Sequence, residues 1–244
     1  MGVPRIKLCG ITSLQDAELC ADAGAWALGM IFWSGSRRRC TVPAAEEIGA
    51  LLRRRVELAG VFVNAPLDTV ARTAERARLS LVQLHGDEGP AFCDEVARRT
   101  GARVVKAARI ANRGDLQALR VFHTDFHLVD AHVDGLRGGT GETLDWSMLA
   151  ARRRGATPLV LSGGLTPENV AGAVEAVAPW AVDSASGTEA APGRKDPERV
   201  GAFVAAVRST APPEPAVENV GGPAPDSHGD GSRHPQTRAA EAAS

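Results

Sequence analysis

The sequence predicts an α/β protein that folds as a single (β/α)8 TIM barrel with a disordered C-terminal tail. Eight short apolar segments typical of strands alternate with amphipathic segments typical of helices, and the connections between them are short. The chain has 244 residues, close to the roughly 250 that such a barrel needs. An open doubly wound sheet, the main alternative, more often has about five or six strands. We place the barrel domain in residues 1–210 and the tail in residues 211–244.

The predicted strands are short apolar runs that stop at a glycine or a polar residue. The second and third are almost continuously apolar, as expected where helices cover the outside of a parallel sheet. The eight predicted strands are residues 5–9, 27–32, 58–63, 81–85, 103–107, 126–130, 158–161 and 180–183. Helix starts are marked by capping residues and first-turn prolines, at Ser13 with Asp16, at Pro43, at 166–168 and at 196–198.

Residues 211–244 differ from the rest of the chain in composition. They are rich in proline and glycine and contain few aromatic or β-branched residues. Such a segment cannot bury enough apolar surface to offset the entropy of ordering it, so we predict that it is disordered. His228 and His234 in this tail match no metal-site spacing and are expected to be solvated.

Charge and cysteine content limit the partners and the compartment. The formal net charge is −1, and the arginine triplets at 37–39, 53–55 and 152–154 are scattered. We therefore expect no nucleic acid and no membrane as partner, and a small molecule bound in a local pocket. No signal segment and no apolar run of about 18 residues is present, and the four cysteines lack CxxC spacing. We expect reduced thiols and a cytoplasmic location.

The carboxyl ends of the predicted strands carry most of the polar residues that stand out in this chain. Active sites of such barrels lie at this rim. Residues 5, 7 and 9 share one face of the first strand, so Lys7 and Cys9 point the same way. A nearby cation favours the thiolate of a cysteine, which makes Cys9 a candidate base. The alternative is a buried structural cysteine.

Two glycine-rich turns follow the seventh and eighth predicted strands, at 162–164 and 184–187. Free backbone N–H groups in such turns can bind an anion, and barrels of this class often bind phosphate there. We predict a phosphate site made by Gly163, Gly164, Ser186 and Gly187. The alternative is that these glycines serve only the geometry of tight turns.

Motifs spread over residues 4–208 resemble those of phosphoribosylanthranilate isomerase, an enzyme of tryptophan biosynthesis. Each is weak alone, but their order and spacing are specific to that family. They are KLCGIT at 7–12, F-x-x-x-S-x-R at 32–38, GVFVN at 60–64, VQLHG at 82–86, LVD at 128–130, GGTG at 138–141 with Asp145-Trp146, LSGGL at 161–165 with PENV at 167–170, and 182–189. Ala185 and Thr188 depart from the usual serine and aliphatic residue, which leaves a backbone phosphate site intact.

The resemblance implies an Amadori rearrangement of N-(5′-phosphoribosyl)anthranilate to the 1-deoxyribulose phosphate. This reaction needs one acid and one base, and neither cofactor nor metal. The family pattern assigns the base to Cys9 and the acid to Asp130. As an acid, Asp130 must hold a proton, whereas Cys9 must lose one, and Lys7 is the group expected to lower the pKa of Cys9.

The remaining rim residues are expected to bind the substrate. Arg38 matches the family arginine that faces the anthranilate carboxylate, although Arg37 and Arg39 leave the register open by one residue. Gln83 and His85 share a face of the fourth strand, and His85 either orients a catalytic group, contacts the aromatic ring or is an ordinary core-edge histidine. Asp183 is expected to anchor the ring nitrogen or sugar hydroxyls, or to hold its loop. Lys7 also has the alternative of simply pairing with a carboxylate.

Three further expectations concern a lid, a metal and the assembly. The glycine-rich loop at 135–141 is the predicted mobile lid. His123, His127 and His132 lack a ligand arrangement, so no metal site is expected. The state of assembly is expected to be monomer or homodimer.

Two alternative functions stay open. One is a related sugar isomerase of histidine biosynthesis, or a bifunctional enzyme; an aspartate is expected in that relative at the position of Cys9, together with a second phosphate site that this chain lacks in its first half. The other is a non-catalytic sensor of phosphate ligands, which would need neither acid nor base.

Overall fold

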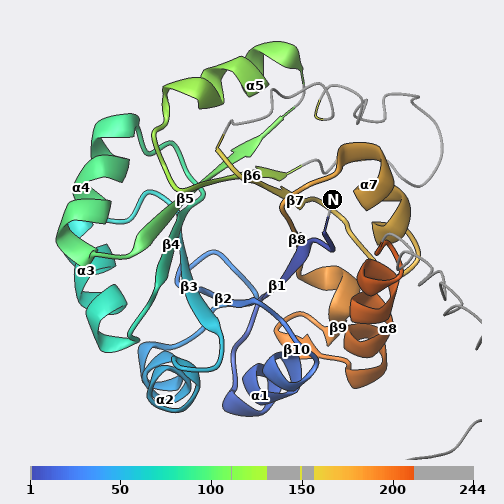
Figure 1. Ribbon diagram of the computed structural model, residues 1–244. Coiled ribbons are helices and arrows are strands. Elements are labelled where there is room, and N and C mark those ends of the chain that lie inside the picture. Colours follow the sequence, from blue (N-terminus) through green and yellow to red (C-terminus); the bar gives the residue numbers. More distant parts are fainter. Residues whose placement is uncertain (1, 111, 131–148, 150–156, 212–244) are drawn as a thin grey trace, which may run out of the picture. The chain divides into compact units, whose positions relative to one another are not determined.

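The computed structural model describes residues 2–110, 112–130, 149 and 157–211, and these form a closed parallel barrel (Figure 1). Each strand pairs with the next, and β8 closes the ring on β1. The strands are β1 Arg5–Cys9, β2 Ala27–Ile31, β3 Glu57–Phe62, β4 Leu81–Leu84, β5 Arg103–Arg109, β6 Phe126–Asp130, β7 Leu159–Ser162 and β8 Ala181–Ser184. The predicted barrel is therefore confirmed, and each strand boundary lies within about two residues of its prediction.

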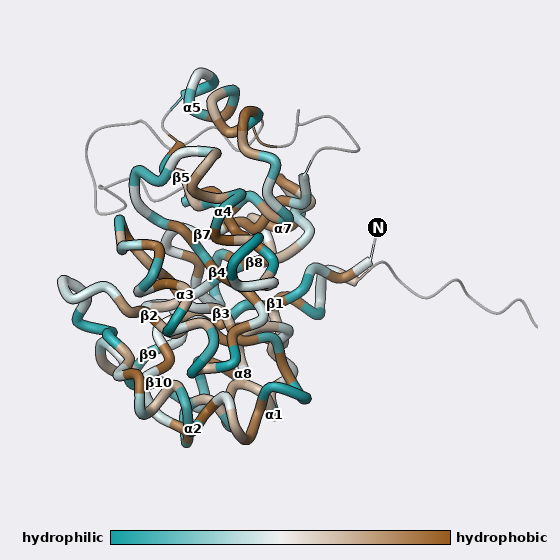
Figure 2. Tube along the Cα trace, turned by 90° about the vertical axis from the view of Figure 1, so that its left-hand side faces the viewer, coloured by the Kyte–Doolittle hydropathy of each residue, from teal (hydrophilic) through white to brown (hydrophobic). Residues whose placement is uncertain are grey.

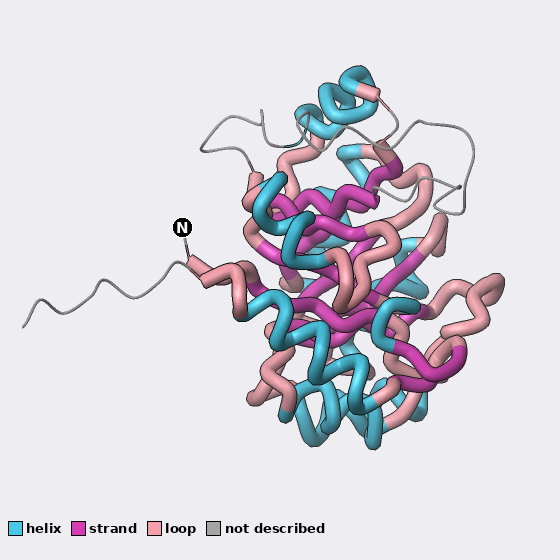
Figure 3. Tube along the Cα trace, turned by 90° about the vertical axis from the view of Figure 1, so that its right-hand side faces the viewer, coloured by secondary structure: helices cyan, strands magenta, loops and turns pink. Residues whose placement is uncertain are grey.

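Helices surround the barrel, and the strands form the central layer that they cover (Figures 1 and 3). The described helices are α1 Leu14–Asp22, α2 Val42–Leu52, α3 Leu67–Arg76, α4 Pro90–Thr100, α5 Arg113–Ala118, α7 Val170–Val177 and α8 Pro197–Arg208. Two short 3₁₀ helices, η1 Leu119–Val121 and η2 Ser186–Thr188, and a hairpin of β9 Glu189–Ala191 and β10 Arg194–Lys195 complete the described elements. The hairpin was not predicted, because its strands are too short to show the alternation of apolar and polar residues that is typical of a strand. No helix in the described ranges is long and apolar enough to cross a membrane.

Helix starts follow the predicted caps at three of four places. The hydroxyl of Ser13 accepts the N–H of Asp16, Thr41 caps α2 with Pro43 in its first turn, and Asp196 caps α8. The start predicted at 166–168 is wrong, because α7 begins only at Val170. There the side chain of Asn169 accepts the N–H of Thr166, which closes a turn before the helix. Along α1 and α2, hydrophobic and hydrophilic residues alternate, as expected for helices with one face on the barrel (Figure 2).

Side chains along each strand alternate between the outer and the inner face of the barrel, and this alternation divides the core into two parts. One set packs outward against the helices, as Ile6 and Leu8 do. The other fills the barrel interior, with members from β2 to β8: Ala27, Ala59, Leu81, Val105, Ala107, Phe126, Leu128, Val160 and Ala181. Because side chains repeat every two residues, the next inward positions toward the carboxyl ends are those of Gln83, Arg109, Asp130 and Asp183.

An aromatic cluster closes the amino-terminal end of the barrel. The rings of Trp26, Phe126 and Trp180 lie with centroids 4.8–5.6 Å apart. The guanidinium carbon of Arg5 lies 4.5 Å from the ring centroid of Trp180, and that of Arg103 lies 5.4 Å from that of Phe126. This end is therefore filled, and the polar inward side chains lie toward the opposite end.

Candidate active site

Cys9 is the last residue of β1 and is buried on the inward face of the barrel. In the β1–β2 register it lies beside Gly29, where an added Cβ would come within 2.6 Å of the Cys9 sulfur. Since real Cβ atoms are never so close to a heavy atom, Gly29 leaves the space that the thiol occupies. The glycine in β2 is thus a packing requirement of the cysteine.

Lys7 precedes Cys9 by two residues on the same face of β1 and forms a buried ion pair with Asp183. Its Nζ donates to Oδ1 of Asp183 at 2.8 Å, and both side chains are almost completely buried. The hydroxyl of Ser162 donates to the other oxygen of Asp183 at 3.3 Å. Burial lowers the pKa of Lys7, but the attractions of Asp183 and Cys9 and their hydrogen bonds together outweigh it, so the net pKa lies above the ordinary value. A fixed ammonium therefore stands beside the thiol.

Lys7 favours the thiolate of Cys9, as expected, but burial has the larger effect on the pKa of the thiol. Burial raises the pKa of the Cys9 thiol above its ordinary value, and the attractions of Lys7 and Lys195 offset only part of this. Asp183, the partner of Lys7, has a smaller opposing effect and raises the pKa of Cys9. The resting group is a neutral thiol with a cation ready beside it.

Asp130 ends β6 on the same inward face as Phe126 and Leu128. Around the ring, β7 and β8 separate it from β1, so Asp130 and Cys9 approach the barrel mouth from different sides. Its register partners are Arg109 on β5 and Ser162 on β7.

Gln83 lies on the inward face of β4, and His85 directly follows the end of this strand. The amide nitrogen of Gln83 lies 2.9 Å from Nδ1 of His85, and Gln83 is buried whereas His85 is partly exposed. Burial lowers the pKa of His85, and the charge of Asp130 opposes this without reversing it, so the ring is neutral at pH 7. Gln83, predicted to bind substrate, is placed to orient the imidazole.

The two glycine turns lie side by side after β7 and β8. Gly163 and Gly164 have φ angles of 106° and 67°, and neither amide donates a hydrogen bond within the described residues. Ser186 and Gly187 lie in η2, where a Cβ on Gly187 would come within 2.0 Å of the Leu165 carbonyl oxygen. Gly187 thus serves the packing of the two turns against each other.

Lys195 and Glu189 support η2, and sequence reasoning missed both. The Nζ of Lys195 donates to the Thr188 hydroxyl at 2.9 Å and to the Ala185 carbonyl at 3.1 Å, and the side chain is buried. The only available signal was a lysine and a glutamate shortly after a glycine turn, which many surface loops also contain.

Arg38 turns toward Glu189 at the rim near β1. Its Nε lies 2.9 Å from both oxygens of Glu189, and an Nη lies 2.9 Å from one of them. The structure therefore separates Arg38 from the more exposed Arg37 and Arg39, and it ties the guanidinium to a carboxylate. Its binding of a substrate carboxylate stays a prediction.

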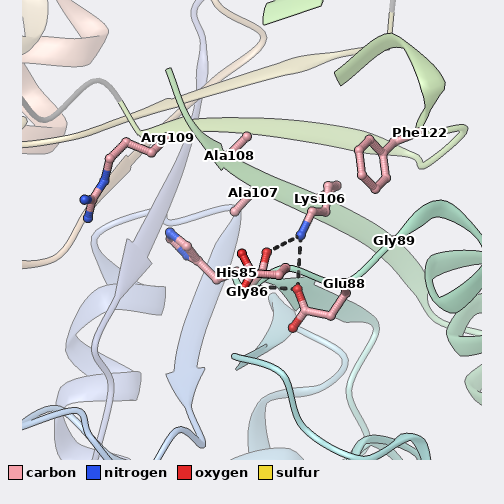
Figure 4. Close-up of a pocket in the computed structure, with 10 residues that line it drawn as sticks. His85, Gly86, Glu88, Gly89, Lys106, Ala107, Ala108, Arg109 and Phe122 are labelled. Carbon is pink, nitrogen blue, oxygen red and sulfur yellow. Dashed lines mark hydrogen bonds and ion pairs between the residues drawn. The ribbon is translucent and has the colours of Figure 1, made fainter. Parts of the chain in front are cut away.

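A pocket of about 540 Å³ opens at the ends of β4 and β5 (Figure 4). Its floor holds a buried ion pair, in which Lys106 Nζ lies 3.0 Å from Glu88 and donates to the Gly86 carbonyl at 2.7 Å. Glu88 in turn accepts the N–H groups of Asn64 and Gly86. This network fixes the loop that follows His85.

Several predicted features lie away from the site or outside the described residues. His127 is buried and contacts the Phe122 carbonyl at 3.1 Å through Nε2, on the outward side of β6, and His123 is exposed. His132, the predicted lid at 135–141, His228, His234 and almost all of the predicted tail are not described. Within the described ranges, no cluster of three potential metal ligands is found.

The groups gathered at this mouth are of the kind that transfer protons and hold an anion. A thiol beside an ammonium and a carboxyl group on another strand can act on one molecule in the mouth. Backbone amides of the glycine turns can hold an anion next to them.

Comparisons with known proteins agree on one family. A family model described as N-(5′-phosphoribosyl)anthranilate (PRA) isomerase matches residues 6–206. N-(5′-phosphoribosyl)anthranilate isomerase of Geobacter sulfurreducens is 48% identical over 200 residues, which cover 82% of this chain and 96% of that protein. The enzyme of the same name from Rubrobacter xylanophilus is 46% identical over 206 residues, 84% of this chain and 99% of that one.

Solved structures of similar proteins superimpose on this barrel. Phosphoribosyl anthranilate isomerase of Thermotoga maritima gives a TM-score of 0.76 at 38% identity, covering 84% of this chain and 99% of that chain. A phosphoribosyl anthranilate isomerase in complex with reduced 1-(o-carboxyphenylamino)-1-deoxyribulose 5-phosphate gives 0.73 at 36% identity, with the same coverage.

Proposed function

Because this chain belongs to the N-(5′-phosphoribosyl)anthranilate isomerase family, we propose that it converts N-(5′-phosphoribosyl)anthranilate to 1-(2-carboxyphenylamino)-1-deoxyribulose 5-phosphate in tryptophan biosynthesis. The observation that carries the proposal is the placement of Cys9 and Asp130 at the carboxyl ends of β1 and β6, facing one barrel mouth. A sensor that only binds phosphate would need neither group.

Asp130 acts as the acid and Cys9 as the base. Asp130 protonates the furanose ring oxygen, and the C1′–O bond breaks to leave an iminium ion. Cys9 then removes the proton from C2′, and the electron pair moves to give an enolamine. The enolamine becomes the ketone when C1′ gains a proton and the C2′ hydroxyl loses one. C2′ is oxidised and C1′ reduced within one molecule, so the reaction is an aldose–ketose isomerisation that needs no external redox agent or cofactor.

The fixed ammonium of Lys7 stabilises the thiolate when it forms. Asp183 keeps that ammonium charged and in place, so we assign Lys7 and Asp183 to the orientation and charge of the base. His85, held by Gln83 and neutral, lies near Asp130 and acts beside the acid. The amides of Gly163, Gly164, Ser186 and Gly187 bind the phosphate. Support comes from the N–H groups of the first two, which donate no hydrogen bond to any residue that the structure describes.

A fluorescence assay that follows the loss of phosphoribosylanthranilate, coupled to the next enzyme of the pathway, tests this function. We expect turnover with the anthranilate compound and little with the bis-phosphorylated aminoimidazole substrate of histidine biosynthesis. The opposite preference, or no turnover at all, would contradict the proposal.

The pH profile of kcat/KM tests the assignment of the base. In the active state of the Cys9–Asp130 pair, Asp130 carries a proton and Cys9 does not. Activity is therefore lost at high pH, when the pair gives up this one proton. Because burial raises the pKa of Cys9, that loss occurs on the alkaline side, above the range of an ordinary thiol. A decline of kcat/KM below that range would contradict the assignment of Cys9.

The cytoplasm is the proposed compartment, supported by four cysteines that are all free and buried. A monomer or homodimer is the proposed assembly. Sedimentation of the purified chain at several concentrations distinguishes the two states.

A further inference from the structure

The lysines of this chain are few and buried. Lys7, Lys106 and Lys195 are the only ones in the sequence, each is at most 4% exposed, and all other basic residues are arginines or histidines. An ammonium is costly to bury unless it is paired. Lys7 lies 2.8 Å from Asp183 and Lys106 lies 3.0 Å from Glu88, so these two have close carboxylate partners. Lys195 requires a different explanation.

The charge of Lys195 is the least compensated of the three. Its ion pair with Glu189 spans 4.0 Å, and Glu189 is engaged more closely by Arg38, whose Nε lies 2.9 Å from both carboxylate oxygens. Burial lowers the pKa of Lys195, and the attraction of Glu189 offsets only part of this effect. An anion bound nearby would therefore stabilise the ammonium.

The ammonium of Lys195 donates to the turn that follows β8. It contacts the Ala185 carbonyl at 3.1 Å and the Thr188 hydroxyl at 2.9 Å. The Ala185 carbonyl and the Ser186 N–H belong to one peptide unit, and in a trans peptide these two groups point in opposite directions. The Ser186 N–H thus points away from Lys195, and it donates no hydrogen bond to any residue that the structure describes.

A cation that donates to a carbonyl also strengthens the N–H on the other side of the same peptide. Hydrogen bonds in such a chain polarise one another, and the effect is larger where water is excluded. The order here is the Lys195 ammonium, the Ala185 carbonyl and the Ser186 N–H, followed by whatever accepts from that N–H. An acceptor that carries negative charge gains most from this order.

We propose that Lys195 is a positioning residue for the substrate phosphate, which aims and polarises the Ser186 amide and places a positive charge one peptide unit behind the anion. The inference rests on the proposed function, in which the Ser186 amide binds phosphate. Lys195 also favours the thiolate of Cys9, but less than Lys7 does. Loss of Lys195 should therefore change phosphate affinity, and with it KM, more than it changes proton transfer.

Two ligands that differ only in the phosphate test the proposal: reduced 1-(o-carboxyphenylamino)-1-deoxyribulose 5-phosphate and its dephosphorylated form. Calorimetry, direct or by competition, gives the Kd of each for the unchanged protein and for Lys195→Met, which removes the charge and the donors but keeps an unbranched side chain. We expect Lys195→Met to weaken the phosphorylated ligand about 10- to 100-fold and the dephosphorylated one less than about twofold.

Kinetics of the same variant separate positioning from a merely structural role. KM should rise by a factor similar to that of the Kd, while kcat should fall less than about threefold. Lys195→Arg should recover part of the phosphate affinity, because a guanidinium keeps both charge and donors. Lys195→Gln, which is neutral but still a donor, is the second variant should Lys195→Met fail to fold, and we expect the same selective loss at smaller size.

Arg194→Met is the matched control, because Arg194 is an exposed cation that precedes Lys195 in β10. It should change both affinities less than about twofold. The proposal is overturned if the folded Lys195 variants bind the phosphorylated ligand as tightly as the unchanged protein does, if they weaken both ligands equally, or if Arg194→Met causes the same loss. Failure of the proposed function is seen separately, as absence of turnover by the unchanged protein.

Discussion

The two ends of the barrel are built from the same eight strands and are chemically opposite. At the amino-terminal end, Trp26, Phe126 and Trp180 fill the interior, with Arg5 and Arg103 placed over two of the rings. Toward the carboxyl end, several of the next inward side chains are polar or charged, among them Lys7, Gln83, Asp130 and Asp183. Burying apolar rings stabilises a fold, whereas burying Lys7 with Asp183 costs desolvation that the ion pair at best recovers. The comparison suggests that stability comes from one end and function from the other.

The largest effect is expected at the mouth. Cys9→Ala should lower kcat by about 10²- to 10⁴-fold with little change in KM, because the thiol adds little to ground-state binding. Cys9→Ser should restore almost nothing, since a hydroxyl is far too weak an acid to supply the anion. Asp130→Asn should be similarly inactive. Steady-state kinetics measures all three, and near-normal turnover by Cys9→Ala would make the thiol a structural residue.

The matching change at the closed end is Phe126→Ala. Phe126 is 4% exposed and contacts both tryptophan rings, so its truncation should lower the free energy of unfolding by about 3–5 kcal/mol. Activity per folded molecule should be nearly unchanged. Urea unfolding and kinetics on the same sample test this, and a large loss of kcat in the folded variant would show that the two ends are coupled.

The glycine turns contribute both to stability and to the proposed phosphate binding. Substitutions at Gly164 and Gly187 should distinguish these two contributions. Gly164→Val should raise KM, because a side chain would occupy the space of the phosphate, at a cost of about 1–2 kcal/mol for its φ of 67°. Gly187→Val cannot leave the fold intact, since its Cβ would overlap the Leu165 carbonyl. Circular dichroism with heating should show a larger loss of stability for Gly187→Val. An unchanged KM in folded Gly164→Val would remove the phosphate site.

The smallest effect is expected from the tail. A chain that ends at Thr210 should keep its Tm and its isomerase activity, because residues 211–244 lack the apolar content to join the core. A fall in Tm of several degrees, measured by calorimetry, would mean that the tail packs on the barrel.

What the sequence by itself determined was the barrel and the positions along it where chemistry could occur. Strand runs with a period of two and capped helices are local signals, so β1 to β8 and the inward faces of Lys7, Cys9 and Gln83 could be predicted from short segments. The start of α7 was misplaced because Thr166-Pro167-Glu168 is a typical helix start, and only the turn closed by Asn169 delays it to Val170.

Only the tertiary structure decided how the charges at the mouth are partnered. Lys7 and Asp183 are far apart in the sequence, as are Arg38 and Glu189, and they meet only when β8 closes on β1 and the β9–β10 hairpin reaches the rim. The sequence therefore predicted a lowered pKa for Cys9, whereas burial raises it and the attraction of Lys7 offsets only part of that rise. Burial and electrostatic attraction depend on distances through space, and a single sequence contains no such distances.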